Sequence, residues 1–225
     1  MTEFLSAFFV NVDSGEILRA SLETLGMLFG ALVLSIVLGL PLGIGLSVTS
    51  PSGLAPNRLS YGALSLIVNV LRSVPFVILF ILLIPVTLAL VGTSLGVRGA
   101  IPPLVLGAAP FLARLIEMAL REVDPAVVEA TQALGASKRQ IVWRTLLPEA
   151  LPGLIAAVTV TAIALVSYTA MAGVVGAGGL GDLAVRYGYQ RFQTDVMLVT
   201  VVLIILLVQG LQVAGDALVA RFSHK

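Results

Sequence analysis

The chain has 225 residues, of which 58% are hydrophobic and only 11% are charged, whereas roughly 25% of the residues in an ordinary soluble domain are charged. So few charged side chains cannot cover the surface of a soluble protein of this length, and the composition therefore predicts an integral membrane protein. Thirteen Lys and Arg against twelve Asp and Glu give a net charge of +1, which argues against nucleic acid as the main partner.

Several kinds of chemistry are excluded by residue types that the chain lacks. It contains no Cys, and its single His is His224, so disulfides, thiol nucleophiles, zinc sites with Cys ligands and His-based triads are all ruled out. The stretch from Gly135 to Lys138 lacks the ending of a phosphate-binding loop, and the chain is not expected to hydrolyse ATP itself. We therefore expect no catalytic residue, no metal ligand and no cofactor.

Long runs without Asp, Glu, Lys or Arg place the membrane-spanning segments. Five such runs contain 34, 25, 15, 32 and 20 residues, at positions 24–57, 73–97, 99–113, 150–181 and 196–215. About 20 helical residues cross the hydrocarbon core, so four runs suffice alone, and the third suffices if Arg114 snorkels to a membrane face or lies inside the bundle. We predict an all-α polytopic membrane protein, one transmembrane domain over 1–225, with spans near 22–48, 59–91, 100–120, 151–175 and 194–217.

The distribution of Lys and Arg between the loops predicts the orientation. With the N-terminus outside and the C-terminus cytoplasmic, the inner segments carry eight basic residues and the outer segments four. The inner ones are Arg58, Arg114, Arg121, Lys138, Arg139, Arg144, Arg221 and Lys225; the outer ones are Arg19, Arg98, Arg186 and Arg191. Arg72 falls within the second span, where it either snorkels to the cytoplasmic interface or lines a pathway.

Small residues and prolines mark the expected spans. The pairs Gly26–Gly30 and Gly39–Gly43 permit close approach of another helix. Prolines interrupt the apolar segments at Pro41, Pro75, Pro85 and Pro110, and either tight packing or kinked helices around a moving pathway accounts for them. Near the end of the third span, Arg114, Glu117 and Arg121 have the i+3 and i+4 spacing of a structural ion-pair network on one helix.

The one long polar insertion, residues 121–148, is predicted to form two short helices on the cytoplasmic face. Asp124 followed by Pro125 is typical of an N-cap and first helical position, and Gly135 suits a left-handed helix end. Ser137 and Gln140 then have the spacing of a capping box. The insertion is interpreted as a docking element for a cytoplasmic protein or, alternatively, as a basic patch that contacts lipid.

Within this insertion the residues resemble the EAA loop of bacterial ABC importer permeases. Glu129, Ala130, Gly135, Leu147 and Pro148 match the spacing of that loop, whereas Thr131 and Thr145 stand where Ala and Ile are usual. Further strings resemble the methionine importer permease family: RSVPF (72–76), IP (84–85), VGTS (91–94), GAAPF (107–111), LPEALPG (147–153) and GAGGLG (176–181).

The resemblance implies a mechanism and a set of partners. Five helices are too few to enclose an aqueous path, so two copies are expected to form a homodimer in the bacterial inner membrane. Two copies of an ATP-binding cassette ATPase would receive the loop through Glu129, Ala130, Gly135, Leu147 and Pro148, and a periplasmic or lipid-anchored substrate-binding protein would deliver methionine, L- or D-, for alternating access. Gly135 would hold the angle between the two short helices.

Two further groups of residues are candidates for contact with substrate or with the binding protein. The fourth predicted span offers the uncharged polar residues Ser167, Tyr168 and Thr169, together with Met171, for the translocation path; many such residues only bond to neighbouring helices. The G-x-G-x-x-G pattern of Gly176–Gly181 lacks the preceding strand of a dinucleotide site and is interpreted as an irregular turn. Tyr187 and Tyr189 beyond it either form an interfacial aromatic belt or contact the binding protein.

Other readings of the sequence remain open. A permease for another amino acid or an organic ion has the same features. An ion-coupled secondary transporter would place a carboxylate near the bilayer midplane or show inverted repeats, and the sequence shows neither. An intramembrane protease would need a His or an Asp pair within the spans, and the spans contain none.

Overall fold

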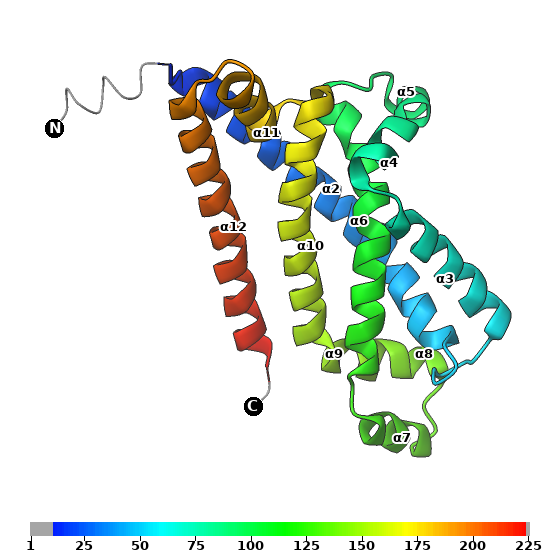
Figure 1. Ribbon diagram of the computed structural model, residues 1–225. Coiled ribbons are helices and arrows are strands. Elements are labelled where there is room, and N and C mark those ends of the chain that lie inside the picture. The colour runs from blue at the N-terminus through cyan, green and yellow to red at the C-terminus, as the bar shows by residue number, and fades with distance from the viewer. Residues whose placement is uncertain (1–10, 224–225) are drawn as a thin grey trace. The chain divides into compact units, whose positions relative to one another are not determined.

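The computed structural model describes residues 11–223, and these residues are helical or irregular, without a strand. The chain divides into two compact units. Within the described residues, unit 1 comprises 11–33, 74–107 and 162–211, and unit 2 comprises 34–73, 108–161 and 212–223. The long helices α2, Ser14–Thr49, α6, Gly96–Arg121, and α10, Leu151–Ala172, each contribute to both units (Figure 1).

Helices of sufficient length and apolar character for a membrane span occur in most of the expected places. These are α2, α6, the segment Leu151–Ala177 and α12, Thr194–Phe222. A fifth span exists if α3, Arg58–Ser73, and α4, Phe76–Leu82, together count as one. The described residues therefore form an all-helical protein with four to five candidate spans.

The expectation of a single element over 59–91 is wrong, because three helices occupy it. After α3 and α4 comes α5, Ile84–Val91. Pro75 takes the N-cap position of α4 with ψ of 135°; proline cannot donate a helical hydrogen bond and disfavours the α conformation in the residue before it. Pro85 lies in the first turn of α5, where its missing N–H costs nothing. Pro41 and Pro110, by contrast, lie inside continuous helices.

Small residues on α2 bring α6 close, as the sequence predicted. In unit 1 a side-chain carbon added at Gly30 would lie 3.1 Å from Ile101. In unit 2 one added at Gly43 would lie 2.7 Å both from the carbonyl oxygen of Ala113 and from the side chain of Ile116. The backbones of α2 and α6 therefore pack too closely at Gly43 for any larger residue.

Unit 2 also holds the polar insertion. It folds as α7, Pro125–Ala133, then α8, Lys138–Ile141, a π-helical segment η1, Val142–Leu146, and α9, Leu147–Glu149. Two helical segments around Gly135 are thus confirmed, but the second is not a regular helix ending at Leu147. A proline in a regular helix collides with the carbonyl four residues earlier, so the wider π turn gives Pro148 room beside Arg144.

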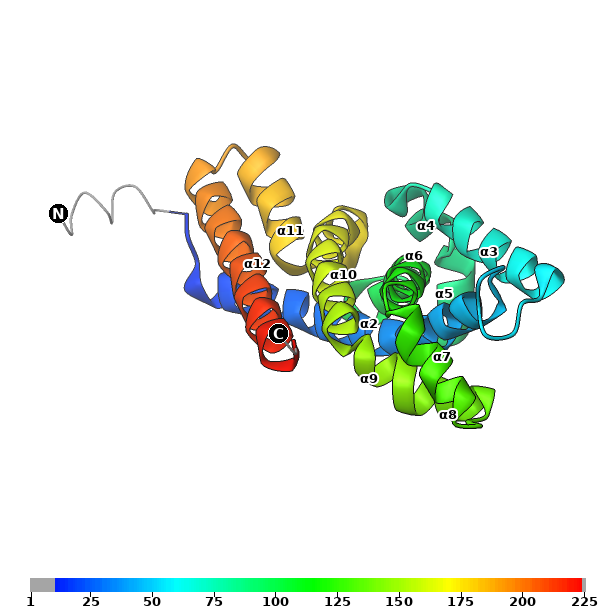
Figure 2. The ribbon, with the colours of Figure 1, turned by 90° about the horizontal axis from the view of Figure 1, so that it is seen from below.

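Unit 1 contains a similarly irregular arrangement. α10 passes into a π-helical segment η2, Gly173–Ala177, and is followed by α11, Gly179–Leu183, and η3, Ala184–Tyr189. The predicted irregular turn is present, because Gly176 and Gly178 have φ of +95° and +78°. α11 then runs beside the start of α12 (Figure 2), where Leu180 and Leu183 pack against Leu203 and Ile204.

Candidate functional site

Local side-chain caps shape the polar insertion of unit 2. The carboxylate of Asp124 accepts a hydrogen bond of 2.9 Å from the backbone N–H of Ala126, at the start of α7. Ser137 and Gln140 form the complete capping box at the start of α8. Between the two helices Gly135 has a φ of +80°, which an L side chain adopts only at a cost. All three sequence predictions for this turn are confirmed.

The two halves of the insertion differ in how they are anchored. In the second half Ile141, Val142 and Leu146 are buried in the core cluster that also contains residues of α6 and α10. The first half, α7, has no buried residue. Glu129 and Ala130 are exposed, as is Gly135. α7 thus projects an uncovered surface from an anchored base, which is the form expected of a docking element.

The two positions that depart from the EAA pattern contact each other. The hydroxyl of Thr131 donates to the carbonyl of Val127 at 2.8 Å, and the hydroxyl oxygens of Thr131 and Thr145 lie 3.3 Å apart. Thr145 is buried in η1, so its hydroxyl needs a partner there. The contact between the two hydroxyls links α7 to the buried η1, beside Val128 of α7, which packs against the same core cluster.

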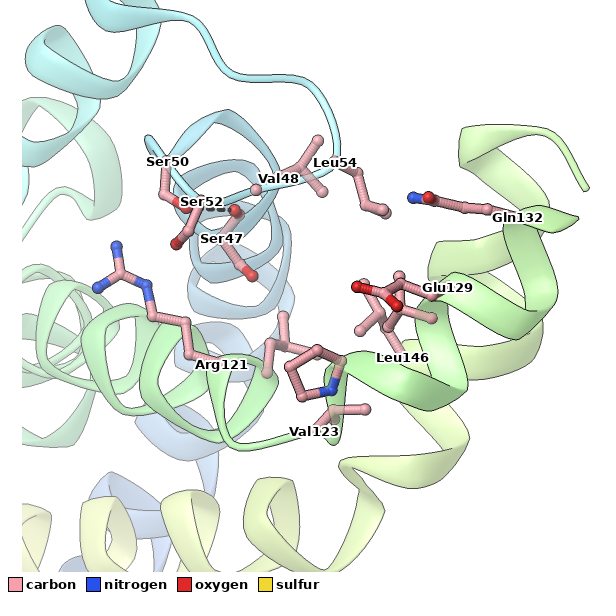
Figure 3. A pocket seen from close by; sticks show the side chains of 14 residues that line it. Ser47, Val48, Ser50, Ser52, Leu54, Arg121, Val123, Glu129, Gln132 and Leu146 are labelled. Carbon is pink, nitrogen blue, oxygen red and sulfur yellow. Dashed lines mark hydrogen bonds between the residues drawn. The ribbon is translucent and has the colours of Figure 1, made fainter.

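A cavity of about 400 Å³ lies between α7 and the end of α2. Figure 3 shows Glu129 and Gln132 projecting from α7 on one side and Ser47, Ser50 and Ser52 on the other. None of the described basic groups forms a salt bridge with Glu129. The charge of Glu129 is therefore free to meet a basic side chain of another protein.

The predicted ion-pair network on α6 is confirmed at the base of the insertion. Glu117 is 1% exposed, accepts a hydrogen bond from Arg114 at 2.6 Å and forms a salt bridge with Arg121 at 2.7 Å. The hydroxyl of Tyr61 on α3 donates to the same carboxylate at 3.2 Å. Arg114 also donates to Ser65 on α3 at 2.8 Å. This network joins α3 to the end of α6 that leads into the polar insertion.

The four path candidates on α10 do not share one face. Ser167 and Met171 are exposed and lie four residues apart, on one side of the helix. The ring of Tyr168 is stacked on that of Phe76, with centroids 4.5 Å apart. Thr169 is buried and its hydroxyl donates to the carbonyl of Val166. Of the four candidates, only Ser167 and Met171 are therefore exposed, and Thr169 has a packing role.

The two tyrosines of η3 also differ. Tyr187 donates to Glu16 at 3.0 Å, and the guanidinium groups of Arg186 and Arg191 lie 4.9 and 4.5 Å from its ring centroid. Tyr189 is 69% exposed. Tyr187 therefore packs within unit 1, and Tyr189 remains available to an external partner.

One contact in unit 1 was not expected from the sequence. The carboxylate of Glu23 and the hydroxyl of Thr24, both on α2, accept from the backbone N–H groups of Gly179 and Leu180 at 2.9 Å each. They cap the N-terminus of α11 from 156 residues away along the chain. The sequence signal for such a cap is a carboxylate directly before the helix. Here the carboxylate lies on α2 instead, so the residues next to α11 do not predict the contact.

Metal binding has no evident site. No three acidic or His side chains of residues 11–223 converge in a way that could hold an ion.

Comparison with known proteins places the chain in a family. Residues 35–225 match the family described as binding-protein-dependent transport system inner membrane component. The chain is 50% identical to the probable D-methionine transport system permease protein MetI of Vibrio cholerae, covering 95% of both chains. It is 46% identical to the methionine import system permease protein MetP of Bacillus subtilis, covering 93% of this chain and 94% of that one.

A solved structure is similar over the same extent. A chain of the inward-facing MetNI methionine ABC transporter superposes with a TM-score of 0.92 at 46% sequence identity, covering 94% of this chain and 98% of that one. The chain therefore belongs to the family of inner membrane components of binding-protein-dependent transport systems, as an all-helical, multi-pass transport permease.

Proposed function

We propose that this chain is the membrane-spanning subunit of an ATP-driven methionine importer. The observation that carries the proposal is the TM-score of 0.92, at 46% identity and nearly full coverage, to a chain of the MetNI methionine ABC transporter. The relatives MetI and MetP, each named for methionine, support the same substrate. A permease for another amino acid or an organic ion is the alternative, and substrate competition separates the two.

In this proposal two copies of the chain form a homodimer with ten spans around the path. Each copy has five spans, near 22–48, 59–91, 100–120, 151–175 and 194–217, the second being the broken pair α3 and α4. The N-terminus lies outside and the C-terminus in the cytoplasm, an orientation supported by the excess of basic residues in the inner segments.

The ATPase would dock on the polar insertion. α7 has no buried residue of its own, and Glu129 on it has no basic partner among the described residues. A basic side chain of an ATP-binding cassette ATPase would complete the pair with Glu129. Because η1 is anchored in the core of unit 2 and Thr145 holds Thr131, movement of α7 would be passed to α6 and α10 as rigid helices.

Substrate and binding protein would meet the other candidate residues. Ser167 and Met171 present a neutral, mildly polar face that suits a thioether side chain and an overall uncharged zwitterion. Tyr189, exposed beyond the glycine-rich turn, is the better candidate of the two tyrosines for contact with a periplasmic or lipid-anchored binding protein.

The test is purification of the tagged chain from its native host in mild detergent, followed by mass spectrometry of the co-purifying proteins. We expect an ATPase at one copy per copy of this chain, and ATP-dependent uptake of radiolabelled methionine by the complex in proteoliposomes. Competition with other amino acids at equal concentration then measures specificity. Absence of any ATPase, both on purification and on cross-linking through α7, refutes the proposal and favours a secondary transporter.

A further inference from the structure

Polar side chains follow one edge of α3 for its whole length. Tyr61, Ser65, Asn69 and Arg72 are spaced three or four residues apart, so they form a single stripe along the helix. Asn69 and Arg72 are exposed, and Ser65 is partly exposed. A helix with such a stripe does not suit a purely lipid environment, because polar groups in hydrocarbon need partners.

The rest of the exposed surface of α3 is apolar. Leu66, Ile67 and Val70 are 64%, 56% and 54% exposed, and they lie on the side of the helix away from the stripe. α3 thus has two different exposed edges, one suited to lipid and one suited to water or to a polar solute.

The polar stripe borders positively charged groups of α6. Arg114 donates to Ser65 at 2.8 Å and to Asn69 at 2.9 Å. Arg114 and Arg121 share the single carboxylate of Glu117, so this cluster keeps one net positive charge. The Arg72 guanidinium lies 6.0 Å from the ring centroid of Phe111, and no carboxylate of residues 11–223 forms a salt bridge with it.

The position of Arg72 along α3 makes this charge unusual. Arg72 comes fourteen positions after Arg58 at the start of the helix, which corresponds to about 21 Å at 1.5 Å per residue. If α3 enters the membrane at Arg58, its other end lies deep in a hydrocarbon core about 30 Å thick. An arginine at that depth faces water, a partner or a transported ion rather than lipid.

We propose that the edge of α3 formed by Ser65, Asn69 and Arg72, together with Arg114, lines the aqueous route of the permease and that Arg72 contacts the carboxylate of an amino-acid substrate. The inference rests on the proposed function, because it takes α3 as part of the second span. A guanidinium can hold a carboxylate through two parallel hydrogen bonds. Arg72 has no carboxylate partner among residues 11–223, whereas Arg114 is already held by Glu117, and Arg72 is therefore the group left for the substrate.

Water access along the edge can be measured directly because the chain has no native Cys. We would introduce Asn69→Cys, with Ile67→Cys and Val70→Cys as matched controls on the apolar edge, and label the assembled complex in proteoliposomes with a water-soluble anionic methanethiosulfonate. Only a hydrated thiolate reacts, so we expect Asn69→Cys to react at least roughly tenfold faster than both controls. Equal rates at all three positions overturn the proposal.

The role of the Arg72 charge has its own readout. In the Asn69→Cys background, Arg72→Gln should reduce the labelling rate with the anionic reagent relative to a cationic one by several-fold, because the local positive potential is lost. With the Asn69 side chain intact, Arg72→Gln should raise the KM for methionine uptake by roughly tenfold, and Arg72→Lys should restore most of it. An arginine that serves only to bind a lipid phosphate or to pack on Phe111 would leave the KM unchanged, and that result overturns the carboxylate contact.

Failure of the two proposals is distinguishable. A complex that contains the ATPase but takes up no methionine argues against the proposed substrate, whereas the labelling pattern of α3 does not depend on uptake. Methionine uptake with an unreactive Asn69→Cys and an unchanged KM in Arg72→Gln contradicts the present inference alone.

Discussion

Gly135 offers the sharpest test of the polar insertion, because its substitution changes backbone conformation and nothing else. The residue has a φ of +80°, and a side-chain carbon added there meets no atom within 4 Å. The cost of Gly135→Ala is therefore only that of the left-handed conformation, about 1–2 kcal/mol, which corresponds to a roughly 5- to 30-fold lower population of the native turn. Gly135→Val should cost more, since β-branched residues are rarer still in this region.

Three variants separate conformation from side-chain size. Asn tolerates the left-handed region, so ATP-driven uptake should decline in the order Gly135, Asn, Ala and Val, with Gly135→Val stopping transport. Membrane insertion of every variant should match that of the natural chain, measured from its amount in washed membranes. If Gly135→Val transports normally, or if Asn and Val are equally impaired, the turn geometry is not what the coupling requires.

Three further experiments test packing and pairing in unit 2. The double variant Thr131→Ala, Thr145→Ile should lose about 1 kcal/mol less free energy of unfolding than the two single variants lose together. A double-mutant cycle, with unfolding in denaturing detergent, measures this difference. Strict additivity would mean that the hydroxyl contact contributes nothing. Gly43→Ala should lower the unfolding midpoint at a cost of about 1–3 kcal/mol, whereas Gly62→Ala, where no atom lies within 4 Å, should not; equal shifts would contradict close packing of α2 on α6. Glu117→Gln should destabilise the permease by about 2–4 kcal/mol. This is less than the full cost of breaking a buried ion pair, because Arg121 is 43% exposed. An unchanged unfolding midpoint would refute a structural role for the network.

Features decided by neighbouring residues were predictable from the sequence. The cap at Asp124, the capping box at Ser137 and the turn at Gly135 depend on the conformational preferences of a few consecutive residues. The network of Arg114, Glu117 and Arg121 was equally predictable, because the spacing of these residues on one helix fixes which side chains meet.

Features decided by contacts between distant segments were not predictable. The Thr131–Thr145 contact depends on how α7 folds back on η1, and the capping of α11 by Glu23 joins residues 156 positions apart. The helix breaks at Pro75, whereas Pro41 and Pro110 lie inside continuous helices, so a proline in the sequence does not by itself predict a break. Whether a proline ends a helix depends on what surrounding helices offer the freed backbone carbonyl.

The lack of any buried residue in α7 has a consequence for assembly of the transporter. A short helix with little buried surface opens at little free-energy cost. Here the Asp124 cap, the Thr131–Thr145 contact and the packing of Val128 against the core cluster hold it. In a permease that has not yet bound the proposed ATPase, the amide protons of residues 126–133 should exchange rapidly, and proteases on the same side of the membrane should find a cleavable segment there. Binding of the ATPase would close this segment, so degradation of unpartnered copies would itself keep the two subunits in balance.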